Sequence, residues 1–311
     1  MVFNSIFFII LLSSGFHADL LPGTGKLRNL LLFLGSLIFY AWGEPVYVIL
    51  MLFSSIFNYY MGTELERLYY DDRKQKINLV FSIIINLAVL VFFKYYGFLL
   101  NTIGGIIGIH IPHPELSLPI GLSFYTFRNL SYLFDIYLSK VSAQRNFLTF
   151  AVYSTMFPYT SAGPIVRYTD IETQLKQRTI NISRFGIGAE LFVKGLAKKV
   201  LLADNLSVLY SSICGHPQMS VFTSWLGILA YTMQLYFDFS GYSDMAIGLG
   251  KMLGFDFNKN FDYPYISTSV SEFWRRWHIS LGSWFRDYIY IPLGGNRVST
   301  LKHIRNILVV W

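Results

Sequence analysis

Long apolar runs separated by short polar connections fill the first hundred residues of the chain. These runs cover residues 2–12, 27–42, 46–61 and 77–100. The last run is long enough to cross a hydrocarbon core of about 30 Å as a helix, even with tilt. We expect the shorter runs to be tilted or only partly immersed. The pattern predicts membrane helices.

The later apolar runs are interrupted, and they follow an irregular stretch at residues 104–119. They cover residues 120–138, 147–159, 185–202 and 221–236, each broken by Gly, Pro or polar residues. A bilayer tolerates such breaks only where neighbouring protein or a watered cavity satisfies the backbone. We therefore expect an all-α, polytopic integral membrane protein with an interior, forming a single membrane domain over residues 1–311.

Composition supports a membrane location and argues against a soluble globule. Hydrophobic residues make up 53% of the chain and charged residues 14%, against about 25% charged residues in soluble domains. The net charge of +7 fits cytoplasmic loops that face anionic lipid better than nucleic-acid binding. The single Cys214 excludes an internal disulfide, so we expect packing alone to hold the fold.

Loop charges predict the orientation of the first helices. Cytoplasmic loops carry the excess of Lys and Arg, so we expect Glu44 and the N-terminus outside. The first run has no basic leader and no convincing cleavage site, so we expect it to be retained. The chain stops inside the short apolar run 304–311, and we expect the sequence to be truncated there. The residues predicted to be cytoplasmic are Lys26, Arg28, Arg67, Arg73, Lys74 and Lys76.

Two blocks rich in Pro and Gly predict broken or re-entrant helices. Residues 118–128 place Pro119 and Gly121 before a polar helical segment that ends with Arg128, and residues 157–167 contain two prolines and a glycine. Helix packing through small residues is the alternative explanation for their composition.

A third block, residues 231–244, places Gln234, Asp238 and Asp244 in an apolar context. Carboxylates at membrane depth are costly, which makes them candidates for a functional site. A structural role as helix caps is the competing interpretation. In either case we expect Asp238 or Asp244 to pair with an arginine between residues 275 and 286, since an unpaired buried charge is expensive.

A fourth block, residues 271–295, is the most informative. Read as one continuous helix, it places His278 on a single aromatic face that Arg275 and Arg276 flank. Histidine suits proton transfer near neutral pH, whereas a hydrogen-bonded packing histidine is the alternative. We expect His278 to line a polar tunnel open to the cytoplasm. The tryptophans predicted to share its face are Trp274, Trp277 and Trp284. No metal-ligand spacing is present, and we expect no metal site.

Together with residues 192–205, these blocks resemble the consecutive signatures of the membrane-bound O-acyltransferase family, in its bacterial alginate O-acetylation branch. The resemblance covers residues 120–296 in order, and extends more weakly to residues 39–43 and 58–59. It implies a ring of transmembrane and re-entrant helices around a central tunnel. It also implies two functional histidines. His278 matches the first, in Trp-Arg-Arg-Trp-His, and the second, in Leu-Trp-His-Gly-Ala, would follow Trp311.

This resemblance predicts a multi-pass O-acyltransferase of the inner (cytoplasmic) membrane. We expect an acyl group, acetyl before D-alanyl, to pass from a cytoplasmic thioester (acetyl-CoA or an acyl-carrier protein) to a hydroxyl of an envelope polysaccharide or its carrier. No tightly bound cofactor is expected. The expected partners are the phospholipid bilayer, the acyl donor, and the glycan or a separate extracytoplasmic acyltransferase. A non-catalytic acyl-passing transporter or scaffold, or an inactive fragment, is the alternative.

Overall fold

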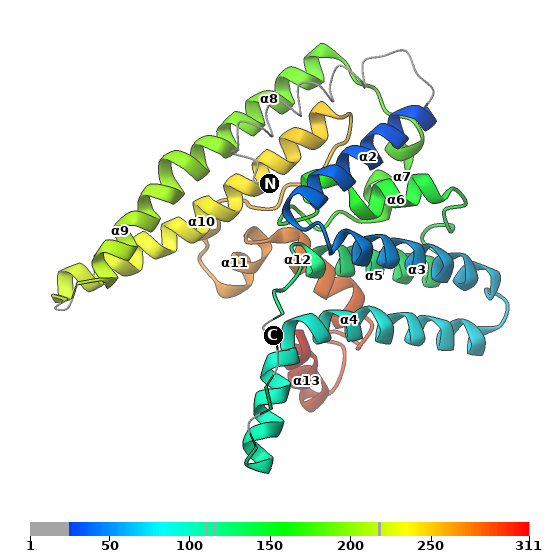
Figure 1. Ribbon diagram of the computed structural model, residues 1–311, viewed down its shortest axis with the longest axis horizontal. Coiled ribbons are helices and arrows are strands. Elements are labelled where there is room, and N and C mark those ends of the chain that lie inside the picture. Colours follow the sequence, from blue (N-terminus) through cyan, green and yellow to red (C-terminus); the bar gives the residue numbers. More distant parts are fainter. Residues whose placement is uncertain (1–24, 110, 113, 115, 217–218, 311) are drawn as a thin grey trace. The chain divides into compact units, whose positions relative to one another are not determined.

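All regular elements in the described part of the chain are helical (Figure 1). The computed structural model describes residues 25–109, 111–112, 114, 116–216 and 219–310. The expectation of an all-α class is confirmed for these ranges. The α-helices are α2 (Gly25–Gly43), α3 (Val48–Arg67), α4 (Asp72–Ile107), α5 (Leu122–Tyr137), α6 (Phe147–Thr155), α7 (Tyr168–Lys176), α8 (Ile182–Ala197), α9 (Asp204–Cys214), α10 (Val221–Met252), α11 (Val270–Arg276), α12 (Ile279–Phe285) and α13 (Thr300–Val310). Short 3-10 turns are η1 (Phe157–Tyr159) and η3 (Pro264–Ile266), and π-helical segments are η2 (Lys198–Ala203) and η4 (Arg286–Tyr290).

The apolar runs from residue 27 onward correspond to helices, with differences at their ends. The run 221–236 is only the first half of α10, which continues to Met252. The stretch 104–119 is not irregular throughout, because α4 continues to Ile107. Gly108, whose φ of 75° is left-handed, follows the end of the helix. Helices α7 and α9 were not predicted. The run 2–12 lies outside the described residues.

Two of the described helices, α3 and α4, are long and apolar enough to cross a membrane by length and composition. Their most apolar windows have mean hydropathies of 1.2 and 2.2. Helix α4 has 36 residues, which corresponds to roughly 54 Å and exceeds the apolar core of a bilayer.

The chain divides into two compact units. The N-terminal unit comprises residues 25–161 and 167–175, and the C-terminal unit comprises residues 162–166 and 176–310 of the described chain. The single membrane domain expected from the sequence stays a prediction.

In the N-terminal unit, α3 packs against α4, α5 and α6. Its centre is an aromatic cluster in which the Tyr132 ring lies 4.7 Å from Phe150 and 5.1 Å from Tyr168, measured between centroids. All three side chains are fully buried. Tilted and edge-on ring contacts of this kind add to the stabilisation from burial.

Buried amides also connect the helices of the N-terminal unit. Asn58 of α3 and Asn86 of α4 form a reciprocal pair, with Nδ2–Oδ1 distances of 3.0 and 2.9 Å. On α5, the Asn129 side chain donates to Ser54 and accepts from Ser154. Because these amide groups are buried, their mutual hydrogen bonds stabilise one helix arrangement over others.

The two Pro- and Gly-rich blocks are breaks, as predicted. Gly121 precedes α5 with φ 74°, and a Cβ there would lie 2.1 Å from the Thr160 carbonyl oxygen, so only glycine fits. Helix α6 ends at Thr155, and η1 follows. Carbonyls exposed by this break accept hydrogen bonds from the fully buried Arg128, whose guanidinium also lies 4.1 Å from the Tyr159 ring centroid.

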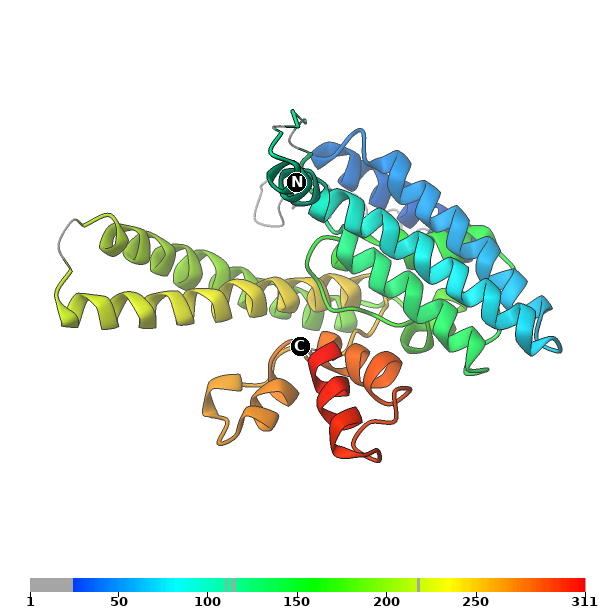
Figure 2. The ribbon, with the colours of Figure 1, turned by 90° about the horizontal axis from the view of Figure 1, so that it is seen from below.

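In the C-terminal unit, the run α8–η2–α9 lies antiparallel to α10 (Figure 2). Glycines meet at two points of this pair: Gly188 faces Gly248, and Gly195 faces Gly241. A Cβ on Gly248 would come within 2.5 Å of the Gly188 carbonyl oxygen. Small residues of this kind allow close backbone approach between membrane helices.

Candidate active site

His278 lies in the C-terminal unit, at a sharp break between α11 and α12. Trp277 leaves the helix with φ −99° and ψ 127°, and His278 is left-handed with φ 44° and ψ 54°. The predicted continuous helix over this block is therefore wrong. Strained backbone of this kind in a residue other than glycine is costly and persists only where the surroundings enforce it.

A neighbouring segment enforces the break. The Ile279 N–H donates to the Asn260 carbonyl at 2.9 Å, and the Asp262 N–H donates to the Arg276 carbonyl at 2.9 Å. These bonds pair the turn at His278 with residues 260–262. They replace helical hydrogen bonds that a continuous helix would have made.

The His278 side chain is 8% exposed and is held by polar partners at one nitrogen. Its Nδ1 lies 3.2 Å from Asn260 Oδ1 and 3.5 Å from Ser280 Oγ. Asn260 is itself buried and donates from Nδ2 to Ser243 Oγ at 3.1 Å. The site therefore joins α10, the segment before η3 and the start of α12.

Two phenylalanine rings form the aromatic surroundings of His278. Phe239 of α10 meets the imidazole edge-on at 4.7 Å between centroids, and Phe261 stacks at 6.4 Å. Helices α11 and α12 have seven residues each and are too short to span a bilayer. Burial lowers the pKa of His278 to about 4, so the imidazole is neutral at physiological pH.

The three predicted tryptophans do not share one face with His278, because the chain turns between them. Trp274 is 41% exposed. The Trp277 ring packs on Phe261 at 5.1 Å, and Trp284 is buried beside Tyr288. Trp277 is linked to the histidine through their shared neighbour Phe261.

The arginines of this block have local partners. Arg276 pairs with Glu272 at 2.9 Å and with Asp262 at 3.6 Å, and Arg286 pairs with the adjacent Asp287. Arg275 is exposed. The contact between Arg276 and Asp262 links α11 to the segment before η3.

The expected arginine partners of the two carboxylates in α10 are wrong, although both carboxylates are paired. Asp238 lies 2.6 Å from Lys199, which also meets Asp204 at 2.7 Å, and Asp244 lies 2.6 Å from Lys198. Both lysines belong to η2, which packs directly on α10. The third polar residue of the block, Gln234, has a buried Oε1 without a hydrogen-bond partner among the described residues.

Sequence reasoning missed Asn260 and the two lysines as parts of these clusters. Asn260 is flanked by Lys259 and Phe261 and gives no local sign of a partner eighteen residues later. Lys198 and Lys199 lie in residues 192–205, which carry part of the family resemblance. Helical periodicity alone does not reveal which helix these lysines will face.

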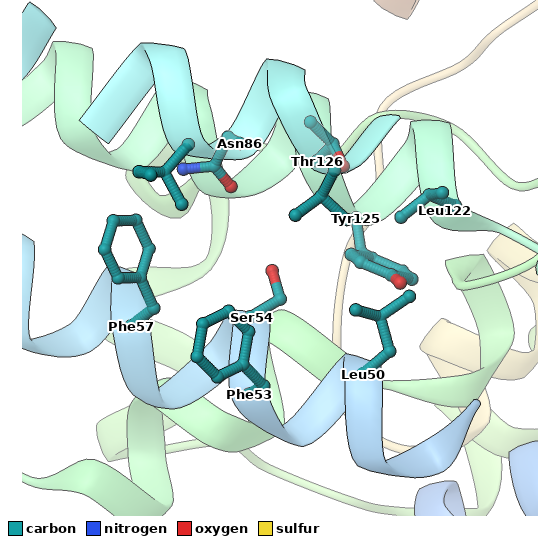
Figure 3. Close-up of a pocket in the computed structure, with 10 residues that line it drawn as sticks. Leu50, Phe53, Ser54, Phe57, Asn86, Leu122, Tyr125 and Thr126 are labelled. Carbon is teal, nitrogen blue, oxygen red and sulfur yellow. The ribbon is translucent and has the colours of Figure 1, made fainter. Parts of the chain in front are cut away.

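A separate hollow opens in the N-terminal unit between α3, α4 and α5 (Figure 3). It contains about 260 Å³ of empty space, open surroundings included. Phe53, Phe57 and Leu122 give it mostly apolar walls, and Ser54, Asn86 and Thr126 add polar atoms. Among the lining groups, the buried Tyr125 hydroxyl has no hydrogen-bond partner in the described residues.

The segments that surround His278 lie within the match to a known sequence family. The sequence model of the membrane-bound O-acyltransferase family matches residues 42–311. The chain belongs to this family. Membership confirms the resemblance and the expected membrane-bound class. As an acyltransferase family, it uses acyl donors as substrates.

The chain is similar to proteins that are named for acyl transfer to alginate, peptidoglycan or teichoic acid. The chain is 42% identical to the probable alginate O-acetylase AlgI of Pseudomonas aeruginosa, covering 99% of this chain and 60% of that protein. It is 34% identical to the peptidoglycan O-acetyltransferase of Helicobacter pylori, covering 91% and 59%. Identity to the teichoic acid D-alanyltransferase of Bacillus subtilis is 28%, covering 58% and 47%. The chain thus spans about 60% of the length of its most similar relatives named here.

Proposed function

We propose that the full-length protein is a membrane O-acyltransferase that moves an acetyl group from a cytoplasmic thioester to a hydroxyl of a cell-envelope polysaccharide or its carrier. The observation that carries this proposal is the 42% identity over 99% of the chain to a probable alginate O-acetylase. The identity to the peptidoglycan O-acetyltransferase, 34%, is higher than the identity to the teichoic acid D-alanyltransferase, 28%. This difference favours acetyl over D-alanyl as the transferred group. An inner-membrane, multi-pass location with a tunnel between the donor and acceptor sides fits this reaction.

The proposed reaction exchanges one ester for another. The acceptor hydroxyl oxygen attacks the thioester carbonyl carbon, the carbon–sulfur bond breaks, and the thiol leaves with the proton from the hydroxyl. A base that takes this proton in the transition state contributes typically about 10²–10⁴-fold to the rate. The required partners are the bilayer, the thioester donor, and the glycan or a separate extracytoplasmic acyltransferase that receives the acyl group.

Within this proposal, His278 lines the tunnel and contacts a substrate. Its support is the combination of a neutral, buried imidazole, a strained backbone and the aromatic contacts with Phe239 and Phe261. His278 shares its left-handed backbone with Ser139 and Tyr263 among the described residues, and strain of this kind often occurs at functional sites. The apolar rings offer a surface for the acyl portion, while the imidazole supplies the polar contact.

Complementation in the source bacterium tests the proposal. The gene is deleted, and base-labile acetyl groups on purified envelope polysaccharides are measured by NMR and mass spectrometry. We expect the deletion strain to lose them and the full-length gene to restore them. Unchanged acetylation would contradict the proposed function, and loss of D-alanyl esters instead would reassign the acyl group.

A further inference from the structure

The orientation of the Asn260 side-chain amide is fixed by a backbone group. The Ser280 N–H lies 3.1 Å from Asn260 Oδ1, and a backbone N–H can only donate. The atom that faces it must therefore be the amide oxygen, because the opposite orientation would bring two donors together. At the other end, Asn260 Nδ2 donates to Ser243 Oγ at 3.1 Å, which agrees with this assignment.

This orientation determines the tautomer of His278. The same Oδ1 lies 3.2 Å from His278 Nδ1, and an amide oxygen can only accept. An unprotonated Nδ1 would place two acceptors in contact within a buried site, which is unfavourable. Nδ1 therefore carries the proton, and Nε2 carries the lone pair.

Ser280 does not offer a better donor to Nδ1. Its hydroxyl lies 2.9 Å from Asn260 Oδ1 but 3.5 Å from His278 Nδ1, so its proton is better placed on the amide oxygen. The Ser280 oxygen accepts from the Ile165 N–H at 3.0 Å. All of these partners belong to the C-terminal unit.

We propose that Asn260 is a positioning residue that holds His278 in its Nδ1–H form and presents Nε2 as a hydrogen-bond acceptor to a substrate O–H or N–H group. In this form the histidine cannot donate to the thioester carbonyl from Nε2. It can accept from the attacking hydroxyl or from an amide N–H of the donor. The substrate part of this inference rests on the proposed function, whereas the tautomer does not.

Nitrogen NMR of the 311-residue chain, labelled with ¹⁵N-histidine and reconstituted in lipid, tests the tautomer without any acyl transfer. The His278 signals are assigned by their absence in His278→Gln. We expect a protonated-type shift at Nδ1 and a nonprotonated-type shift at Nε2. A wild-type His278 found in the Nε2–H form, or in a mixture of both forms, would overturn the proposal.

Substitutions then test whether Asn260 is the cause. Asn260→Leu removes the acceptor and should convert the single Nδ1–H form into a mixture, whereas Asn260→Asp keeps an acceptor oxygen and should keep Nδ1 protonated. Asn306→Leu is the matched control, since Asn306 is also buried and its hydrogen bonds go to Leu293, Gly295 and Arg305, none of which contacts His278 in the described structure. An unchanged tautomer in a folded Asn260→Leu variant would refute the positioning role.

Measurements of acylation in cells separate the proposed function from the positioning role of Asn260. In cells carrying the full-length gene, Asn260→Leu should lower polysaccharide acylation about tenfold or more, since a histidine in the wrong tautomer loses its role in proton transfer, and Asn260→Asp should restore a substantial part. If wild-type protein shows the expected tautomer but the gene supports no acylation, the proposed function fails while the role of Asn260 stands. Full acylation by an Asn260→Leu variant with a mixed tautomer would overturn the substrate part of the inference.

Discussion

At the scale of the residue, the environment of His278 sets its charge. The imidazole is buried, and its polar contacts among the described residues are at Nδ1: Asn260 Oδ1 at 3.2 Å and, more distant, the Ser280 hydroxyl at 3.5 Å. Loss of hydration disfavours the charged form, which is the physical cause of its pKa of about 4. A neutral histidine keeps one nitrogen available as an acceptor.

This low pKa predicts a specific pH dependence of stability. The folded pKa lies below the unfolded value of about 6.5, so between these values the unfolded chain binds a proton that the folded chain does not. The contribution of His278 to the free energy of unfolding is therefore highest above about pH 6.5, where the imidazole is neutral in both states, and it decreases as the pH falls below this value. On going from about pH 7.5 to about pH 5, the wild-type chain should lose up to ~2 kcal/mol more than His278→Gln. Thermal unfolding of both proteins in the same detergent measures this difference, and equal losses would contradict it.

The sequence alone could single out His278 as a candidate, but it could not predict the contacts that surround this residue. The motif that contains His278 made it a candidate, whose role stays a prediction, whereas the predicted aromatic face was wrong because periodicity extends a helix until a local breaker appears. Here the breaker is non-local: the turn forms because Ile279 and Arg276 pair with the backbone at residues 260–262. Trp284 is consequently packed on Tyr288 and lies outside the histidine contacts.

At the scale of the element, close backbone contact defines the packing of α8 on α10. Gly248→Ala would place a Cβ 2.5 Å from the Gly188 carbonyl oxygen, so the helices must separate. We expect the change to lower the stability of the C-terminal unit by roughly 1–3 kcal/mol, the usual cost of overpacking. Unfolding in detergent, monitored by tryptophan fluorescence, measures this loss.

Gly186→Ala is the matched control for this substitution. Gly186 also lies in α8, but a Cβ there has no atom within 4 Å. Because alanine is the better helix former by about 1 kcal/mol, this variant should be neutral or slightly more stable. Equal destabilisation by both changes would show that the glycine contacts do not hold the helix pair together.

The helices that coincide with long apolar runs were predictable, whereas α7, α9 and the electrostatic partners of the helices were not. The two carboxylates of α10 are paired with Lys198 and Lys199 because the π-helical segment η2 places both lysines against α10. Helical periodicity shows which side chains share a face, but not which neighbouring helix that face will meet. Extrapolation of the α-helical period therefore could not have chosen lysine over arginine as the partner.

At the scale of the whole molecule, the orientation of α3 and α4 in the bilayer is a prediction from loop charge. On a Cys214→Ser background, the Lys74→Cys position should react with a membrane-impermeant maleimide only after cells are opened. Glu44→Cys, beyond the opposite end of α3, should react in intact cells. The basic residues around Lys74 favour the cytoplasmic side by the positive-inside rule. Labelling of position 74 from outside alone would reverse the topology.

We propose that His278 takes part in acyl transfer and is more than a packing residue. The most direct test measures ester-linked acyl groups on the envelope polysaccharide of cells that carry the full-length gene with His278→Ala. His303→Ala is the control, since His303 contacts the Tyr290 hydroxyl outside this cluster. Protein amounts are matched by blotting membranes. We expect His278→Ala to lose at least about 10²-fold in acyl transfer, the lower end of the contribution of a proton-transfer group, while it accumulates normally. Wild-type acylation by a stably accumulated His278→Ala protein would contradict the account.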